Sequence, residues 1–331
     1  MSGDRGPEVV VDAALFVARR YPDLRLYLVG QEDVLQKLLA DKSHRQPARD
    51  QLHIVHADEV VTMQDPPLMA LRNKKNSSMR VAINMVKNGE VDACVSAGNT
   101  GALMATARFV LKMITGIDRP AICSALPSAQ GHTFMMDLGA NIDCSSEHLY
   151  QFALMGSVLA NAIDETENPR IGLLNIGEEE IKGNDVVKQA SQLLSNSRLN
   201  YIGYVEGNDI FGTKADVIVT DGFVGNVSLK TIEGVAKLIA DFLAQEFRRN
   251  WFTKLIGLLA LPALGRFKRK VDPRRYNGAS LLGLQGIVVK SHGSADKVGF
   301  AHAIEIAMLE VQHNVTGVID RKININGGIL N

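Results

Sequence analysis

The stretch Arg170–Asp185, RIGLLNIGEEEIKGND, contains the pattern that decides the fold. Its apolar run from Ile171 to Leu174 is typical of a strand buried in a parallel sheet. A polar loop with two glycines follows, and from Val186 onward the apolar residues have helical spacing. The order of strand, glycine-containing loop and helix predicts an α/β protein, in which ligands bind where such loops leave the sheet.

The loop in this stretch has two interpretations. Lys182, beside Gly183 and free backbone N–H groups, suits a bound phosphate. The alternative is a solvated loop in which Glu178, Glu179 and Glu180 favour the start of the next helix, because carboxylates are stabilised at helix N-termini. The loop by itself leaves both interpretations open.

The same order of elements recurs along the chain. Predicted strands at 93–96, 216–220 and 287–289 each run into a polar, glycine-containing loop that precedes a helix. Because the carboxyl ends of parallel strands meet at one edge of a sheet, these loops predict a shared crevice at that edge. Each loop taken alone is equally consistent with a tight turn and a helix cap.

The composition is that of a soluble globular protein. The 331 residues include 36 basic and 36 acidic side chains, so no net charge attracts the chain to nucleic acid. Hydrophobic residues make up 46%, enough for a sizeable core. The cysteines, Cys94, Cys123 and Cys144, fit free thiols in a reducing compartment. We see no leader and no apolar run that would span a bilayer, so we expect a cytoplasmic protein.

Residues 248–275 are the compositional exception. Arginines and lysines flank an apolar centre, with Asp272 as the one acid. The pattern predicts an inserted basic amphipathic hairpin that lies in the bilayer interface. The alternative is a helix pair buried in a dimer interface. The side chains predicted to contact the membrane are Trp251, Phe252, Leu255, Leu258, Leu259 and Leu261.

The two ends of the chain also stand out. Residues 1–7, MSGDRGP, form a turn-like, glycine-rich loop, and such a loop normally follows a strand. Residues 316–331 are rich in glycine and asparagine, which predicts a disordered tail. We therefore expect one α/β domain over residues 1–315, with its first strand absent.

Six loop segments form a recognisable set. They are SAGNTGALM from Ser96, DLGANIDC from Asp137, LLNIGEEEIKGND from Leu173, DGFVGNVSLKTIEG from Asp221, YNGASLLGLQG from Tyr276 and VKSHGSAD from Val289. Together they resemble the bacterial phosphate acyltransferases of phospholipid synthesis, the acyl-[acyl-carrier-protein]–phosphate transacylases. The resemblance covers residues 1–315, and six segments in order are far more specific than one glycine loop.

The resemblance implies a fold and a reaction. The fold is an α/β/α sandwich with a mostly parallel sheet, similar to isocitrate and isopropylmalate dehydrogenases, in a homodimer. The reaction transfers a long-chain fatty acyl group from acyl carrier protein to inorganic phosphate. The acyl phosphate then feeds a glycerol-3-phosphate acyltransferase. Family members also associate peripherally with the membrane through a segment that matches Trp251–Lys270. No metal or other cofactor is implied.

The chain departs from the family at its start. The family opens with a strand that runs into a D-x-M-G-G-D loop, whereas this sequence begins inside that loop, with Ser2 in place of a glycine. The missing strand predicts a gap or an exposed edge in the sheet.

The reaction needs groups that hold phosphate, stabilise the oxyanion and assist the departing thiolate. We predict Lys182 as phosphate anchor or oxyanion stabiliser, Asn226 as an amide donor and His292 as a proton relay. Direct attack of phosphate on the thioester is favoured, because phosphate is already partly dianionic at neutral pH. Predicted phosphate- and substrate-binding residues are Gly98, Asn99, Thr100, Gly101, Gly177, Gly183, Asn184, Gly222 and Gly225.

Each of these residues also has a structural interpretation. Lys182 would be a surface lysine, Asn226 a helix cap and His292 a turn histidine bonded to backbone. Asp137 and Asn141 are expected to be architectural, because a carboxylate aimed at phosphate would repel it.

Two other functions remain open. One is a phosphotransacetylase-like acyltransferase that uses coenzyme A thioesters. The other is a non-catalytic adaptor that binds carrier protein and membrane. A dehydrogenase of the same broad fold is disfavoured, because no clear G-x-G-x-x-G follows a strand. Carrier protein is acidic as a class, so the basic clusters at 72–75 and 266–270 are candidate docking sites.

Overall fold

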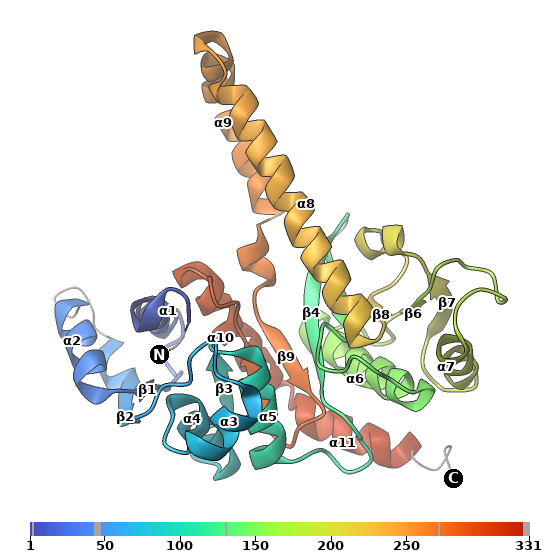
Figure 1. The fold of residues 1–331 in the computed structure, drawn as a ribbon, viewed down its shortest axis with the longest axis horizontal. Helices are drawn as coiled ribbons and strands as arrows, with labels where there is room; N and C mark the ends of the chain where they lie inside the picture. Colours follow the sequence, from blue (N-terminus) through green and yellow to red (C-terminus); the bar gives the residue numbers. More distant parts are fainter. Residues whose placement is uncertain (2, 43–47, 130, 271, 327–331) are drawn as a thin grey trace.

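The computed structural model describes residues 1, 3–42, 48–129, 131–270 and 272–326 (Figure 1). The helices are α1 (Gly6–Arg20), α2 (Glu32–Lys42), α3 (Pro67–Asn73), α4 (Ser78–Lys87), α5 (Thr100–Leu111), α6 (Ser146–Asp164), α7 (Asp185–Ser195), α8 (Gly222–Arg248), α9 (Trp251–Lys270), α10 (Lys297–Gln312) and α11 (Val315–Asn326). The strands are β1 (Leu26–Gly30), β2 (Leu52–His56), β3 (Ala93–Ser96), β4 (Ala121–Ser128), β5 (Gly131–Met136), β6 (Ile171–Leu174), β7 (Tyr201–Val205), β8 (Val217–Val219), β9 (Ala279–Leu282) and β10 (Ile287–Lys290).

The main sheet has eight strands in the order β3-β10-β9-β4-β5-β8-β6-β7. Its pairs are parallel except around β9 and β4, where β9 is antiparallel to both neighbours and β4 is antiparallel to β5. β6 has the bounds predicted from its apolar run, and so does β3.

Side chains alternate between the two faces of the sheet along each strand, so both faces carry apolar side chains. Helices bury these side chains on each face. On one face Ile122, Met135 and Ile218 pack with Leu229 and Ile232 of α8. The other face packs on α6, a helix buried along most of its length. Strand residues in that second layer include Cys123, Phe134, Met136, Ile171, Leu173, Val217 and Val219. The predicted α/β/α sandwich is confirmed.

The prediction of one shared crevice is wrong. Three antiparallel pairs, β10–β9, β9–β4 and β4–β5, separate the two ends of the sheet, so β3 and β10 run opposite to β5, β8 and β6. The loops after β3 and β10 therefore leave one edge of the sheet, and those after β5, β6 and β8 leave the other. Periodicity within a strand carries no information about its direction relative to distant strands.

The sheet has a gap on its amino-terminal side. β1 and β2 form a separate parallel pair, and β3 is the edge strand of the main sheet. A cavity of about 850 Å³ lies between them, lined by both β1 and β3.

The carboxyl-terminal segment is more ordered than its composition predicted. Residues 315–326 form α11, in which Val315, Ile319 and Ile323 are buried against α6. The prediction of a disordered tail is wrong for residues 316–326, because three apolar side chains at helical spacing bury a continuous stripe. Residues 327–331 lie outside the described part of the chain.

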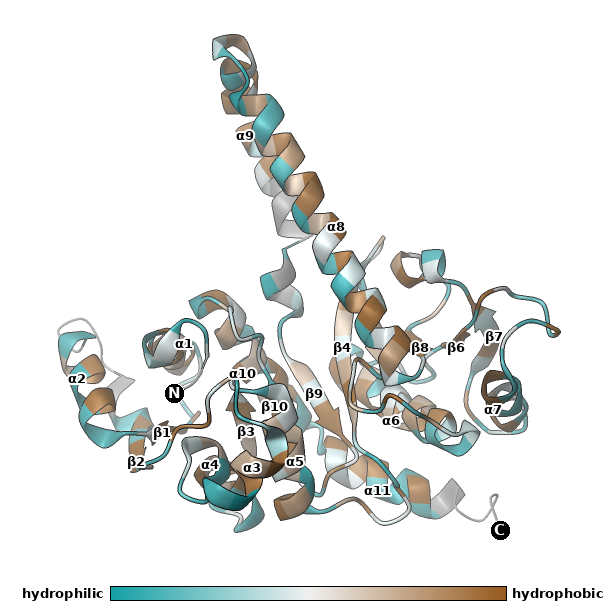
Figure 2. Ribbon diagram, viewed as in Figure 1, coloured by the Kyte–Doolittle hydropathy of each residue, from teal (hydrophilic) through white to brown (hydrophobic). Residues whose placement is uncertain are grey.

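The predicted hairpin at 248–275 has different bounds in the structure. α8 extends well beyond the sheet and packs against α9, and the two form a projecting arm (Figures 1 and 2). The turn lies at its tip, where the Thr253 N–H donates to Asn250 Oδ1 (2.9 Å). Gly257 faces the ring of Phe247, which allows close packing of the helices. The hairpin thus consists of the outer part of α8 and all of α9.

Candidate active site

Three segments meet at the carboxyl ends of β3 and β10. The Ser291 N–H donates to Ser96 O (2.9 Å), which joins the loops after the two strands. The Asp4 N–H donates to Gly293 O (3.0 Å), which brings the amino-terminal loop to the same place. We call this group, Asp4, Ser96, Lys290, Ser291 and His292, the β10 cluster.

Lys290 is the chemically distinctive residue of the β10 cluster, and the sequence analysis missed it. Its side chain is 8% exposed, and its Nζ donates to Ser291 O. Burial lowers the pKa of Lys290 to about 8, with Asp4 acting in the opposite direction and Lys230 of α8 in the same direction. The interaction with Lys230 places the inner part of α8 beside the cluster. A lysine that ends an apolar strand and precedes Ser-His-Gly was the available sequence signal.

His292 is held at both its backbone and its ring. Its N–H donates to Asn277 Oδ1 (2.8 Å), and its Nδ1 accepts from the Ser294 N–H (3.2 Å). Because Nδ1 acts as an acceptor, the neutral ring carries its proton on Nε2. The ring is thereby in a defined tautomer, as a proton relay requires.

The glycine loop after β3 uses its side chains mainly for structure. Asn99 caps α5 by accepting from the Ala102 N–H (3.0 Å), and its Nδ2 lies 3.0–3.3 Å from the carbonyl oxygens of residues 62, 63 and 65. Gly101 lies against Pro67, where a Cβ would approach within 2.7 Å. Thr100 is exposed at the first turn of α5. The Asn99 side chain is therefore committed to the loop, whereas Thr100 is accessible.

The loop after β5 is organised by a buried carboxylate. Asp137 accepts from the backbone N–H groups of Ile122, Gly139, Ala140 and Asn141 at 2.7–3.3 Å, and from the Asn141 side chain at 2.9 Å. Burial raises the pKa of Asp137, and these hydrogen bonds oppose that change. The expectation that Asp137 and Asn141 are architectural is confirmed by this bonding.

The start of α8 sits directly on the Asp137 loop. The Gly222 N–H donates to Asn141 O (2.7 Å). A Cβ at Gly225 would lie 1.9 Å from Asp137 O, so only glycine fits there. Asn226 is exposed and lies against Gly139. A Cβ added to Gly139 would lie 3.3 Å from the Cβ of Asn226. Gly222 and Gly225 thus permit close packing, and Asn226 is the accessible polar group.

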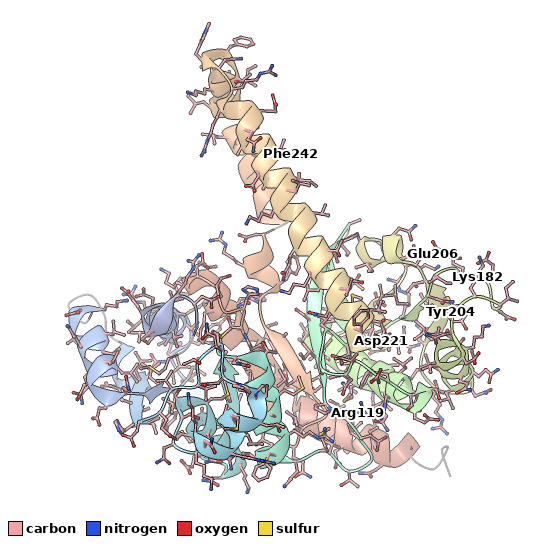
Figure 3. All side chains as sticks on the ribbon, in the orientation of Figure 1. Arg119, Lys182, Tyr204, Glu206, Asp221 and Phe242 are labelled. Atoms are coloured by element: carbon pink, nitrogen blue, oxygen red, sulfur yellow. The ribbon has the colours of Figure 1, made fainter. Side chains whose placement is uncertain are left out.

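Lys182 lies on the long loop after β6, toward one end of the molecule and away from Asp221 at the foot of α8 (Figure 3). Its side chain is 45% exposed, and its Nζ is 4.0 Å from Glu179 Oε1. Gly183 has φ +89° and faces the Asn175 side chain, and Asn184 caps α7 by accepting from the Val187 N–H (2.9 Å).

Gly177, in the same loop, is packed between Glu179 and Lys182, with an added Cβ 2.7 Å from Glu179 Oε2. Ile176 and Ile181 are 81% and 80% exposed, so this loop also presents apolar side chains. The three predicted catalytic residues therefore lie on three different segments: Lys182 on the loop after β6, Asn226 in the first turns of α8 and His292 on the loop after β10. No hydrogen bond or ion pair described in the structure joins one of them to another.

The six residues predicted to contact the membrane all lie on α9. Trp251 is 77% exposed and Leu259 74%, and the other four are exposed by about half. No helix within the described ranges is long and apolar enough to cross a bilayer. The neighbouring basic side chains at 266–270 lie outside the described side chains. In the other basic cluster, Arg72 and Lys75 are exposed, but Lys74 donates to Val60 O and pairs with Asp65.

Comparison with known proteins identifies the family. Residues 1–318 match the fatty acid synthesis protein family. A phosphate acyltransferase from Methylococcus capsulatus is 60% identical, with 95% of this chain and 92% of the relative covered. One from Legionella pneumophila is 57% identical, with 100% and 97% covered.

The solved structures support the fold. A phosphotransacetylase from Streptococcus pyogenes has a TM-score of 0.60 at 18% identity, with 92% of this chain and 91% of that chain covered. A 4-hydroxythreonine-4-phosphate dehydrogenase from Klebsiella pneumoniae has a TM-score of 0.51 at 14% identity, covering 93% and 94%. At these identities the likeness concerns the fold alone. The sequence relatives show the family: the chain belongs to the phosphate acyltransferases, enzymes that transfer acyl groups to phosphate.

Proposed function

We propose that this enzyme transfers a long-chain fatty acyl group from acyl carrier protein to inorganic phosphate and releases acyl phosphate. The observation that carries the proposal is the near-full-length identity of 57–60% to phosphate acyltransferases. In the proposed reaction a phosphate oxygen bonds to the thioester carbonyl carbon and the C–S bond breaks. The thiol group of the carrier protein leaves with a proton, and no metal or redox cofactor takes part.

The β10 cluster supports phosphate binding. Lys290 is a buried cation whose described hydrogen bond goes to a neutral carbonyl. Lys230, which also pairs with Glu233 (2.8 Å), adds a second positive charge nearby. An anion placed between them would offset both the burial of Lys290 and the repulsion between the lysines. We propose Lys290 and Lys230 as phosphate-binding groups, with His292 relaying a proton from its own loop.

We retain Lys182 and Asn226 as catalytic candidates. Both are accessible: Lys182 lies on the loop after β6, and Asn226 lies in the first turns of α8. Asn226 would donate to the developing oxyanion from α8, the helix that also carries Lys230, and Lys182 would do so only after its loop moved toward α8. Thr100 and the backbone around Gly98 and Gly101 are proposed to contact substrate, and so are Gly177, Gly183 and Asn184 through the loop after β6. Gly222 and Gly225 are buried at the start of α8 and are proposed to act only by positioning that helix.

The arm supports a lipid substrate. Its apolar side chains, with Trp251 at the tip, suit the interface of an anionic bilayer, where a long-chain acyl phosphate would also partition. We propose that the cytoplasmic enzyme binds the membrane peripherally through this arm. The exposed apolar positions of α8, which include Leu238, Ile239 and Phe242, are proposed to pair with a second copy in a homodimer. A glycerol-3-phosphate acyltransferase is the proposed consumer of the product.

The reaction is tested by phosphate-dependent release of free carrier protein from palmitoyl carrier protein. Lys182→Ala is compared with Lys87→Ala, a change at an exposed lysine ending α4. We expect turnover that saturates in phosphate, a loss of about 100-fold or more in Lys182→Ala, and no change in the control. A higher kcat/KM with palmitoyl-coenzyme A would favour the coenzyme A alternative, and a folded protein without turnover would favour the adaptor.

The arm is tested by co-sedimentation with vesicles containing phosphatidylglycerol. The double change Leu258→Ser and Leu259→Ser should reduce binding at least tenfold. Ile176→Ser, which alters an equally exposed apolar side chain on a different loop, is the matched control. Equal binding by the unmodified protein, the double variant and the control would show that the arm does not contact the membrane. Analytical ultracentrifugation would then show whether the arm forms a dimer instead.

A further inference from the structure

The side chain of Asn277 joins the β10 cluster to the helix α10. Asn277 comes just before β9, in the segment YNGASLLGLQG. Its Nδ2 donates to Ser291 Oγ (2.8 Å) and to Gly299 O in the first turn of α10 (2.7 Å). Its Oδ1 accepts from the His292 N–H (2.8 Å). Both ends of the amide therefore have described partners.

These partners allow only one orientation of the Asn277 amide. A backbone N–H only donates and a carbonyl oxygen only accepts, so the atom that faces the His292 N–H must be oxygen. For the same reason the atom that faces Gly299 O must be nitrogen. The bonding pattern thus requires a side chain that accepts and donates at once, as asparagine does.

The backbone that carries this amide is itself fixed on α10. The Asn277 carbonyl oxygen accepts from His302 Nδ1 (3.0 Å). Gly278 follows with φ +125°, and a Cβ added there would lie 3.1 Å from Ala303 Cα. Glycine tolerates both the positive φ and the close approach. Asn277 is therefore anchored to the helix independently of its contacts with the loop after β10.

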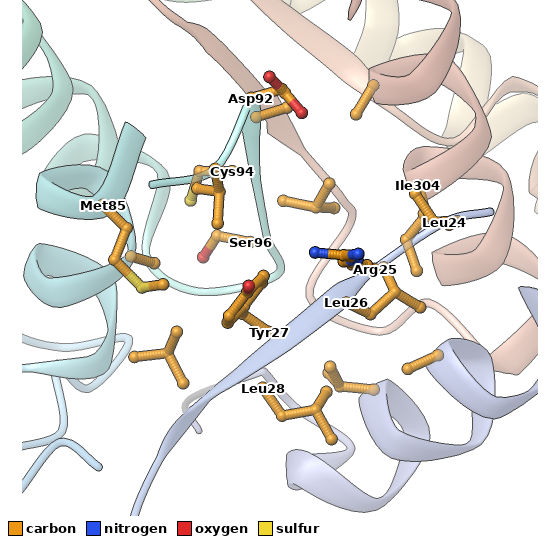
Figure 4. Close-up of a pocket in the computed structure, with 18 of the residues that line it drawn as sticks. Leu24, Arg25, Leu26, Tyr27, Leu28, Met85, Asp92, Cys94, Ser96 and Ile304 are labelled. Carbon is orange, nitrogen blue, oxygen red and sulfur yellow. The ribbon is translucent and has the colours of Figure 1, made fainter. Parts of the chain in front are cut away.

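Asn277 determines the orientation of one peptide group, the one between Ser291 and His292. The N–H of this group donates to Asn277 Oδ1, and its C=O accepts from Lys290 Nζ. Because a peptide group is planar, fixing the direction of its N–H also fixes the direction of its C=O. On the other side of Ser291, its own N–H donates to the carbonyl oxygen of Ser96, which Figure 4 shows on β3. The position of the Lys290 ammonium group therefore depends on Asn277 through one rigid unit.

We propose that Asn277 is a positioning residue for phosphate binding: it holds the Ser291–His292 peptide so that the Lys290 ammonium group and the His292 backbone keep fixed positions in the β10 cluster. Asn277 itself does not contact the substrate. Without its amide, the His292 N–H loses its acceptor and the peptide is free to rotate, which moves the carbonyl that holds Lys290. The inference rests on the proposed function of the β10 cluster, and it assigns a role to a residue outside that cluster.

The test compares the unmodified protein with Asn277→Ala and Asn161→Ala. The second variant is the matched control, because Asn161 is a half-buried residue of α6 whose Nδ2 also donates to a carbonyl, Thr166 O (2.9 Å). Turnover of palmitoyl carrier protein is measured at varied concentrations of inorganic phosphate. We expect Asn277→Ala to raise the KM for phosphate at least tenfold and to change the KM for palmitoyl carrier protein less than twofold. The control should change neither, because a loss of stability alone lowers the amount of active enzyme and leaves both KM values unchanged.

A double-mutant cycle shows whether Asn277 acts through Lys290. In the Lys290→Met background, adding Asn277→Ala should change kcat/KM for phosphate less than twofold, because the group that Asn277 positions is no longer present. An equal loss in both backgrounds would show that Asn277 acts independently of Lys290 and would overturn the inference.

Hydrogen exchange gives a second measurement, on the unmodified protein, which serves even if Asn277→Ala does not fold. Saturating inorganic phosphate should slow exchange of the His292 amide at least tenfold, because a bound anion fixes Lys290 and with it the peptide. Unchanged exchange, or an equal KM for phosphate in Asn277→Ala and the control, would overturn the inference and leave the proposed function intact. An unmodified protein that neither binds phosphate in titration calorimetry nor turns over would overturn the proposed function, and the inference with it.

Discussion

The two ends of the structure are built from the same kinds of element, strands covered by helices, but they differ in whether neighbouring strands pair. In what we call the β5–β7 half (β5, β8, β6, β7 and α6), every strand pairs with its neighbour in the sheet, and the core includes many side chains with 0–1% exposure. In the β1–β3 half (β1, β2, β3, α1 and α4), the strands also carry apolar residues, although no residue of β2 is buried, and β1 and β3 are separated by a cavity. The difference shows that apolar strands and covering helices do not make a closed core unless neighbouring strands also pair.

The energetic scale of the difference is large. At about 24 cal/mol per Å³, a closed and empty cavity of this size would cost about 20 kcal/mol as an upper bound, more than the roughly 5–15 kcal/mol by which a domain is stable. Such a space must be hydrated or occupied.

The two halves also differ in how their buried ionisable groups are hydrogen-bonded. Asp137 accepts five hydrogen bonds, whereas Lys290 donates to a single carbonyl among its described hydrogen bonds.

Among the substitutions, the largest loss of stability should come from Gly225→Ala, at the close contact between α8 and the loop after β5. Gly225→Ala would place a Cβ 1.9 Å from Asp137 O, so the loop after β5 must separate from α8. We expect a loss of about 3 kcal/mol or more in the free energy of unfolding, measured with urea. Gly234→Ala is the matched control on the same helix, where an added Cβ meets nothing within 4 Å, and it should stabilise by about 1 kcal/mol. A neutral Gly225→Ala would contradict the packing.

A second comparison places the same truncation in each half. Leu159→Ala removes a side chain that is 1% exposed within the core around α6. Leu28→Ala removes one that is 6% exposed but lines the cavity. We expect losses of about 3 and about 1 kcal/mol respectively, because a side chain beside an existing void gives up fewer contacts. Equal losses in urea unfolding would mean that the cavity closes in solution.

A third prediction concerns the buried carboxyl of Glu310. Burial raises its pKa to about 8, although a hydrogen bond from the Ser280 hydroxyl opposes the change. Between about pH 4.3 and 8 the folded state therefore holds a proton that the unfolded state has lost, so stability should fall as pH rises. The slope is at most about 1.4 kcal/mol per pH unit. Glu310→Gln should flatten the profile, and an unchanged slope in the variant would assign it to other groups.

Lys290 should give a smaller pH effect than Glu310, and its sign is opposite. With a folded pKa of about 8 against about 10.4 unfolded, the unfolded state binds more protons between these values. Stability should therefore rise with pH across this narrower window. Lys290→Met should remove the rise, whereas Lys87→Met should retain it. Thermal midpoints between pH 7.5 and 10.5 measure the effect, and a rise that persists in Lys290→Met would show that another group causes it.

Some residues were interpretable from the sequence because their signals are local. The apolar runs at 93–96 and 171–174 are strands with the predicted bounds, and the helical spacing after each glycine loop marks real helices. Six ordered loop segments were sufficient to indicate the family, which the full-length relatives confirm. The short strand β9 was missed, because Ala279–Leu282 lies in a Gly- and Leu-rich stretch without clear alternation.

The amino-acid sequence by itself determined the α/β class, most elements, the family and the polar loops that carry candidate chemistry, because each depends on neighbouring residues. The tertiary structure alone decided the relative direction of the strands, the commitment of Asn99 to its own loop, the burial of Lys290 beside Lys230, and the cavity between β1 and β3. These features depend on contacts between residues far apart in the chain, and a local pattern does not specify which distant partners meet.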